Sequence, residues 1–255
     1  MTEAVTSAAN PHIRSLSTLK TRRGRTAAGA FLIEGARELT RAIAAGRAIE
    51  EIVLCPSIAS PGAAELATAA AAPVTTVAEP PFAKLSVRQS PDGIIGVAST
   101  WETVLGAIDR DLVLVAEAIE KPGNLGAMFR TADAAGAAVV AADPTVDVFN
   151  PNVIRASQGA LFSVPFAVTD STSALAWASE RGAVVVASPD AGMPLWDIDL
   201  SGPVAIVIGS EHEGIGGEWR TAGTTVRIPM AGDADSLNAS VAAAIVLYEA
   251  VRQRR

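Results

Sequence analysis

The stretch LVLVAEAIEKPGNLGAMFRTADAAG at residues 112–136 decides the fold class. Its first five residues, 112–116, form an unbroken apolar run that is typical of a buried strand. A helix is predicted over about 125–135, and Gly136 is placed to cap it. Further strands are expected at 138–141, 164–168, 183–187, 204–208 and 225–228, with helices between them. Continuous Val/Ile runs that alternate with helices predict an α/β domain whose parallel sheet is covered on both faces.

The first hundred residues show the same alternation on a smaller scale. Short strands are predicted at 31–33, 49–54, 74–77 and 94–98. Helices are predicted at 36–46 and 63–72, and turns are expected at Pro80-Pro81 and at residues 91–93. Residues 101–110 have the character of a connector. We therefore predict two domains, a small α/β domain at 1–105 and a larger one at 106–255.

Composition narrows the class of protein. Of the 255 residues, 49% are hydrophobic and 18% charged, which excludes a disordered chain. No apolar run approaches the ~18 residues that suggest a membrane span, and the first residues do not resemble a secretory signal. Cys55 is the single cysteine, and the two histidines, His12 and His212, leave little for a metal site. We expect no metal, no membrane partner and a reducing cytoplasmic location.

Charge is distributed unevenly along the chain. Residues 1–105 carry a net charge of +1 and residues 106–255 carry −8. Within residues 11–25 there are five basic side chains and no acidic one: Arg14, Lys20, Arg22, Arg23 and Arg25. Clustered positive charge attracts phosphate, so this segment is a candidate contact for an anionic partner. The alternative is a solvated, partly mobile arm.

Three polar, glycine-containing loops follow apolar strands, at 117–126, 209–216 and 229–240. In a parallel sheet, ligands bind beyond the carboxyl ends of the strands. No G-x-G-x-x-G or G-x-x-x-x-G-K-[ST] motif is available to hold a phosphate, and no G-x-S-x-G motif supplies a serine nucleophile. These absences weigh against an NAD-type oxidoreductase and a serine hydrolase. A phosphate-free cofactor held by backbone amides and apolar walls remains, and S-adenosylmethionine is such a cofactor.

The sequences of these loops resemble a known family. KPGNLGAMFRTADAAG, IVIGSEHEGI and IPMAGDADSLNASVAAAI are similar, in order and spacing, to the three motifs of the SpoU/TrmH family of RNA ribose 2′-O-methyltransferases in the SPOUT superfamily. The resemblance covers about residues 110–252 and includes ribosomal RNA methyltransferases of the thiostrepton-resistance type. NPHIRSL, FLIEGAREL and SPDGIIGVA in the first domain resemble the small RNA-binding domain, similar to ribosomal protein L30e, of many such enzymes.

This resemblance implies a fold, an activity and partners. It implies a trefoil knot in the second domain and a homodimer with the site near the dimer interface. It also implies methyl transfer from S-adenosylmethionine to a ribose 2′-hydroxyl of RNA. Ribosomal RNA is the favoured target, with antibiotic resistance as one biological role. Transfer RNA methylation and a catalytically inactive RNA-binding protein are the alternatives. The target nucleotide and the proton acceptor are not given by the sequence.

The motif matches also imply site residues. The predicted catalytic set is Asn124, Arg130, Glu211, Ser236 and Asn238. The Arg130 guanidinium is suited to hold a phosphate or stabilise a forming alkoxide, and a role as base is disfavoured because arginine side chains stay protonated in proteins. The structural alternatives are a surface arginine at 130 and helix-capping asparagines. His212 and Glu213 have no family equivalent and are predicted to be surface loop residues.

The family also implies the cofactor and RNA contacts. The predicted cofactor residues are Gly209, Ile228 and Leu237, where glycine permits close backbone approach and the apolar side chains wall the adenine. The resemblance assigns the five basic residues of 11–25 to contact with the RNA backbone, because RNA binding requires neutralisation of phosphates.

Overall fold

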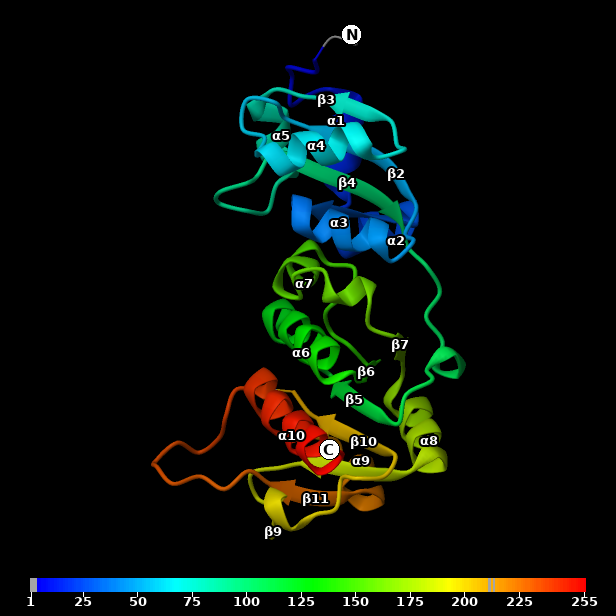
Figure 1. Cartoon of the computed structure of the whole chain (residues 1–255), viewed down its shortest axis with the longest axis vertical. Helices are drawn as coiled ribbons and strands as arrows, with labels where there is room; N and C mark the ends of the chain where they lie inside the picture. The colour runs from blue at the N-terminus through cyan, green and yellow to red at the C-terminus, as the bar shows by residue number, and fades with distance from the viewer. Residues whose placement is uncertain (1–3, 211, 213) are drawn as a thin grey trace. The chain divides into compact units, whose positions relative to one another are not determined.

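The computed structural model describes residues 4–210, 212 and 214–255, and it divides into two compact units (Figure 1). Unit 1 comprises the chain up to Trp101 together with Asp147–Ser163. Unit 2 comprises Glu102–Val146 and Val164–Arg255. The chain thus leaves unit 1 after Trp101 and returns to it for the segment 147–163, which the predicted division at residue 105 does not include.

Unit 2 is built on a parallel sheet of seven strands, counted over the described residues, in the order β7-β6-β5-β10-β8-β11-β9. The strands are β5 (Leu112–Glu117), β6 (Ala138–Ala142), β7 (Phe166–Thr169), β8 (Ala183–Ala187), β9 (Met193–Pro194), β10 (Val204–Ile208) and β11 (Thr224–Arg227). The predicted α/β class is confirmed. The very short β9 has no apolar run that predicts it, whereas the other strands lie within two residues of the predicted ranges.

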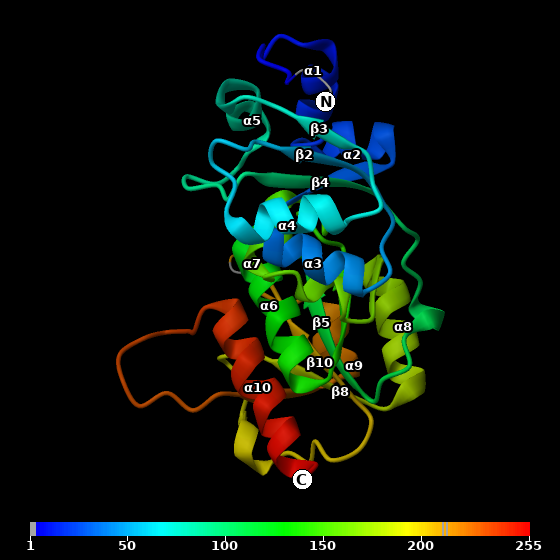
Figure 2. The ribbon, with the colours of Figure 1, turned by 45° about the horizontal axis from the view of Figure 1, so that its top comes forward.

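Helices cover both faces of this sheet. Side chains that alternate along the strands, such as Val113 and Val115, join Trp219 in one core cluster beneath α8 (Ser171–Arg181) and α9 (Gly217–Ala222). The opposite face packs against α6 (Pro122–Ala135) and α10 (Ala239–Gln253), which lie side by side (Figures 1 and 2). Strands β5, β6 and β10 are buried at every position, which explains why their sequences are apolar throughout except for Glu117 at the end of β5.

The order of the strands brings distant loops to one edge. Strand β8 lies between β10 and β11, so the loops that leave these three strands start side by side at the carboxyl edge of the sheet. Strand β5, which precedes the first motif, pairs with β10 on its other side. The trefoil knot that the family resemblance implies stays a prediction.

Unit 1 holds a mixed sheet in the order β1-β4-β2-β3. Its strands are β1 (Ala30–Glu34), β2 (Ile49–Leu54), β3 (Val74–Thr76) and β4 (Ile94–Ser99). Strand β4 is antiparallel to both neighbours, and β3 is parallel to β2. The helices of this unit are α1 (Pro11–Thr18), α2 (Arg22–Ala28), α3 (Ala36–Ala44), α4 (Pro61–Ala69), α5 (Glu79–Leu85) and α7 (Pro151–Ala156).

The basic segment 11–25 lies in helices α1 and α2 and the turn between them, and Arg14, Arg22 and Arg23 are exposed, as the alternative of a solvated segment expects. Helix α1 starts after Asn10, whose side chain accepts a hydrogen bond from the His12 N–H, and Ile13 and Leu16 are buried beneath it. The Thr21 hydroxyl caps α2 in the same way by accepting from the Gly24 N–H. Both segments therefore have ordinary N-cap chemistry and buried anchors.

The turn predicted at Pro80-Pro81 is also wrong. Both prolines lie in the first turn of α5, which begins at Glu79. A proline is tolerated there because the first N–H groups of a helix have no partner within the helix. Pro81, Phe82 and Leu85 of this helix are buried in unit 1.

The segment 147–163 supplies part of the interior of unit 1. Phe149 and Phe162 from this segment pack with Phe31 and Trp101, with ring centroids 4.7–6.3 Å apart. Aromatic contacts at such distances add to the stabilisation that burial alone provides. At the start of the segment, Asp147 pairs with the buried Arg25. Unit 1 is therefore assembled from two separate stretches of the chain.

Candidate active site

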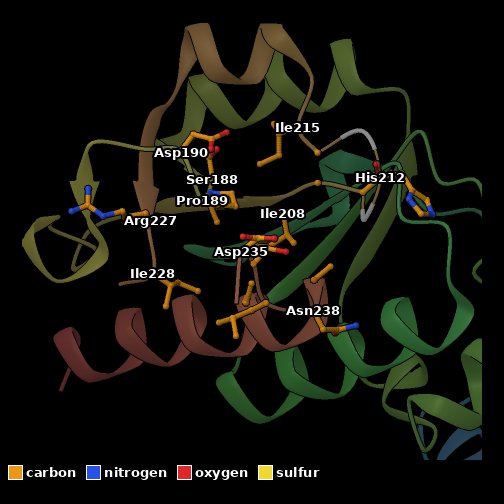
Figure 3. A pocket seen from close by; sticks show the side chains of 18 of the residues that line it. Ser188, Pro189, Asp190, Ile208, His212, Ile215, Arg227, Ile228, Asp235 and Asn238 are labelled. Carbon is orange, nitrogen blue, oxygen red and sulfur yellow. The ribbon is translucent and has the colours of Figure 1, made fainter. Parts of the chain in front are cut away.

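A cavity of about 800 Å³ lies in unit 2 at the carboxyl ends of β8, β10 and β11 (Figure 3). This volume is within the range of small-molecule and cofactor sites, roughly 300–1,000 Å³. The loops expected to carry the chemistry after β10 and β11 both line it. The predicted site residues that line it are Gly209, Ile228, Ser236, Leu237 and Asn238. The cavity therefore lies where the rule that ligands bind beyond the carboxyl ends of parallel strands (the strand-end rule) predicts it.

Ser210 and Gly214 pair with each other in the loop after β10. The Ser210 N–H donates to the Gly214 carbonyl at 3.0 Å, and Gly214 has a left-handed backbone with φ +71°. A Cβ added at Gly209 would lie 2.2 Å from the Gly214 carbonyl oxygen, so only glycine fits there. Glu211 and Glu213 lie outside the described residues. His212 is exposed, as predicted for a surface loop residue. It also lines the cavity, which was not predicted.

Glu117 anchors the far end of this loop. Its side chain is buried at the end of β5, and its Oε2 accepts a hydrogen bond of 3.0 Å from the Gly216 N–H. Burial raises the pKa of Glu117, and the nearby Asp143 carboxylate raises it further, whereas the bond from Gly216 opposes the rise. Glu117 is not among the site residues predicted from the sequence. Its position directly after the predicted buried strand 112–116 is the sequence feature that could have indicated a site residue.

Two predicted catalytic residues meet each other. The Asn238 Nδ2 donates to the Asn124 Oδ1 at 3.1 Å, which joins the first motif to the third. Asn238 is the N-cap of α10, since its Oδ1 accepts from the Ser240 N–H at 2.9 Å. Asn124 lies in the first turn of α6 and is 8% exposed. For Asn238 the capping alternative and the site assignment therefore coexist, while the N-cap of α6 is Lys121 and not Asn124.

Arg130 does not line the cavity. It lies on α6 with its side chain exposed. The structure therefore does not bring it together with Gly209, Ser236 and Asn238 in the lining of that cavity.

The loop after β8 lines the cavity as well, and sequence reasoning missed it. Ser188, Pro189 and Asp190 follow directly on the last residue of β8 (Figure 3). Arg227 at the end of β11 holds the next part of this loop, because its Nη1 donates to the carbonyls of Ala191 and Gly192. Applying the strand-end rule to every strand would have found this loop.

The predicted RNA contacts fall into two groups. Arg14, Arg22 and Arg23 are exposed. Arg25 is 2% exposed, and its guanidinium donates to Asp147 and to the Leu19 carbonyl. Its assignment to RNA contact therefore does not fit the structure. The half-buried Lys20 donates to the carbonyls of Lys84 and Ser86, so its ammonium group is also engaged within unit 1.

Among the described residues, no group of three or more His, Cys, Asp and Glu side chains comes together that could hold a metal ion. Among the same residues, none of the helices has both the length and the apolar character needed to cross a membrane.

Comparison with known proteins gives consistent matches. The model of the SpoU rRNA Methylase family matches residues 111–248, and that of the MRM3-like substrate binding domain matches residues 10–96. The chain is 33% identical over 261 residues to a Streptomyces viridochromogenes protein named 23S rRNA (uridine(2479)-2′-O)-methyltransferase, covering 92% of this chain and 87% of that protein. It is 31% identical over 247 residues to the Bacillus subtilis 23S rRNA (guanosine(2553)-2′-O)-methyltransferase RlmP, covering 96% and 97%.

A solved structure agrees over the whole length. The SpoU methyltransferase AviRb from Streptomyces viridochromogenes, crystallised in complex with the cofactor AdoMet (S-adenosylmethionine), superimposes with a TM-score of 0.88 at 31% identity. The match covers 96% of this chain and 98% of that one.

Proposed function

The chain belongs to the SpoU rRNA Methylase family, and we propose that the cavity at the ends of β8, β10 and β11 is where it performs the family's reaction. It is an RNA ribose 2′-O-methyltransferase that uses S-adenosylmethionine and acts on ribosomal RNA. The observation that supports this site most is the convergence of residues from the second and third motifs on one cavity, together with the Asn124–Asn238 bond that ties the first motif to it.

The lining of the cavity fits the cofactor. Ile208, Ile215, Ile228 and Leu237 supply apolar walls for an adenine. Gly209 lets the backbone approach a ligand closely. Asp190 and Asp235 lie in the lining with Lys121 and Arg220, so both signs of charge are present for the charged methionine end. The bound cofactor would supply an electrophilic methyl group on a sulfonium.

The chain's own residues have three tasks in this reaction. The ribose hydroxyl must be placed in line with the methyl group, and positioning alone accounts for much of the rate of such reactions. We assign Asn124, Asn238 and Ser236 to that positioning. We assign Arg130 to the substrate phosphate or the forming alkoxide, because a guanidinium stays protonated and donates in a fixed fork. Glu211 is assigned, by its motif match, to orienting Arg130 or the substrate.

We further propose a homodimer. Arg130 is exposed and does not line the cavity of its own chain, and we infer that a second copy brings its Arg130 there. Val241 and Tyr248 support this arrangement, since both are nearly half exposed and lie seven residues apart on one face of α10. Sedimentation equilibrium of wild type and of Tyr248→Glu tests it. A wild-type monomer at micromolar concentration would contradict the proposal.

We assign binding of the RNA substrate to unit 1, because residues 10–96 match a substrate binding domain. Exposed Arg14, Arg22 and Arg23 are the proposed phosphate contacts. The two relatives are named for different nucleotides, a uridine and a guanosine, so their targets do not transfer to this chain. A role in antibiotic resistance stays a prediction, which drug sensitivity of cells with and without the gene would test. With ribosomal RNA as substrate, we place the enzyme in the cytoplasm.

The decisive experiment is transfer of a labelled methyl group from S-adenosylmethionine to purified ribosomal and transfer RNA. We expect labelled ribosomal RNA, and mapping of ribose methylation in total RNA with and without the gene would give the nucleotide. Label on transfer RNA alone would favour the transfer RNA alternative. RNA binding without transfer would indicate an inactive binding protein, and NAD binding without S-adenosylmethionine binding would point to an oxidoreductase.

A further inference from the structure

Ser188 has an unusual environment within the cavity. It is 3% exposed, and its hydroxyl oxygen has no hydrogen-bond partner in the part of the chain that the structure describes. Among the buried side-chain polar atoms that share this property, it is the one that lines the cavity. Buried polar groups in native proteins are nearly always satisfied, so an orphaned hydroxyl on a cavity wall points to a ligand atom.

The backbone holds Ser188 in place. Its N–H donates to the Val226 carbonyl of β11 at 2.9 Å, directly after β8 ends at Ala187. Because β8 lies between β10 and β11, Ser188 lies between the strand ends that carry Gly209 and Ile228. These are the residues assigned above to the adenosine part of the cofactor.

The surroundings of the hydroxyl determine which part of a ligand it suits. Ile208, Ile215 and Ile228 share the cavity wall with it, and Asp190 lies two residues further along the same loop (Figure 3). A carboxylate would be poorly solvated among the isoleucines and repelled by Asp190. A purine fits better, because its faces are apolar and its edge carries nitrogen donors and acceptors. A serine hydroxyl can both donate and accept a hydrogen bond.

We propose that the Ser188 hydroxyl forms a hydrogen bond with the adenine edge of the bound cofactor and makes the cavity selective for that base. This inference rests on the proposed function, since it requires S-adenosylmethionine to bind in this cavity. It assigns a specificity role to the loop after β8, which none of the three motifs contains.

Binding of S-adenosylhomocysteine, measured by calorimetry without RNA, tests the proposal independently of catalysis. We expect Ser188→Ala to weaken binding by about 5–10-fold, the usual range for one lost neutral hydrogen bond. The melting temperature of the ligand-free variant should not fall, because the orphaned hydroxyl has no partner to lose. Ser157→Ala is the matched control. Ser157 is fully buried in unit 1 and donates to the Ile154 carbonyl, so its loss should lower stability and leave ligand affinity unchanged.

Ligand analogues identify the partner atom. Four analogues of S-adenosylhomocysteine each lack one adenine nitrogen: N1, N3, N6 or N7. We expect one of them to bind wild type about 5–10-fold more weakly and to bind Ser188→Ala and wild type equally. Additive losses for all four would place the hydroxyl elsewhere and overturn the adenine assignment. Unchanged affinity of Ser188→Ala would overturn the contact itself. Failure of wild type to bind S-adenosylhomocysteine would instead refute the proposed function, and this inference with it.

Discussion

Arg25 offers the sharpest test of the structure, because the sequence predicted an RNA contact and the structure shows a buried ion pair. Its Nε lies 2.6 Å from Asp147 Oδ2, and its Nη1 donates to the Leu19 carbonyl at 2.9 Å. The Arg25 side chain is 3% exposed and that of Asp147 is 16% exposed. The substitution Arg25→Met keeps the length of the side chain and removes its charge and its donors.

The expected loss of stability arises from the Asp147 carboxylate, which the substitution leaves without its charged partner. Removing one partner of a buried pair typically costs ~3–5 kcal/mol, because the other charge stays buried without compensation. Asp147 keeps some contact with water and still accepts from the Phe149 N–H, so we expect the lower end, about 3 kcal/mol. This corresponds to about a 150-fold change in the unfolding equilibrium constant of unit 1.

Hydrogen exchange of the β1 and β4 amides measures this loss in unit 1 without requiring the whole chain to unfold as one step. Arg23→Met is the matched control, since Arg23 is exposed on the same helix and should cost less than about 0.5 kcal/mol. The double variant Arg25→Met, Asp147→Leu should recover most of the loss, because it removes both charges. Equal effects of the Arg25 and Arg23 substitutions would refute the buried-pair interpretation.

Further predictions concern the cavity and the RNA surface. Arg130→Ala should abolish methyl transfer while leaving calorimetric affinity for S-adenosylmethionine within about twofold; near wild-type turnover would contradict its role. Charge reversal at Arg22 and Arg23 should weaken RNA binding and reduce its salt dependence, and an unchanged slope of log affinity against log salt would count against them. Gly209→Ala should reduce S-adenosylhomocysteine affinity more than about tenfold, because a Cβ there would lie 2.2 Å from the Gly214 carbonyl oxygen. An unchanged dissociation constant by calorimetry would disprove this. The raised pKa of Glu117 makes its ionised form costly in the folded state, so wild type should lose stability relative to Glu117→Gln as pH rises from the unfolded pKa through the folded one. Urea unfolding across this pH range checks that sign.

The parallel sheet was predictable because the central strands are apolar at every position except Glu117, the last residue of β5. Strands such as β5 and β10 are covered on both faces, so their sequences carry no alternation that a surface strand would show. The location of the site followed from the same strands, since Gly209 and Ile228 stand at their carboxyl ends.

Other features depend on contacts that local sequence does not encode. Arg25 has the same local appearance as Arg22 and Arg23, and its ion-pair partner Asp147 lies 122 residues away in the chain. The Asn124–Asn238 bond spans 114 residues in the same way. Ser188 was missed for a different reason, because Ala-Ser-Pro-Asp carries no motif and its role depends on β8 lying between β10 and β11.

The return of residues 147–163 to unit 1 has a consequence for synthesis of the protein. The hydrophobic interior around Phe31 stays incomplete until Phe149 and Phe162 have left the ribosome. At ~5–20 residues per second, the stretch from 101 to 163 takes about 3–12 s to translate. During that interval the N-terminal half is an unfinished fragment. A gene truncated near residue 105 would encode only this fragment. We therefore expect residues 1–105 to be a poor independent module for transfer to another enzyme.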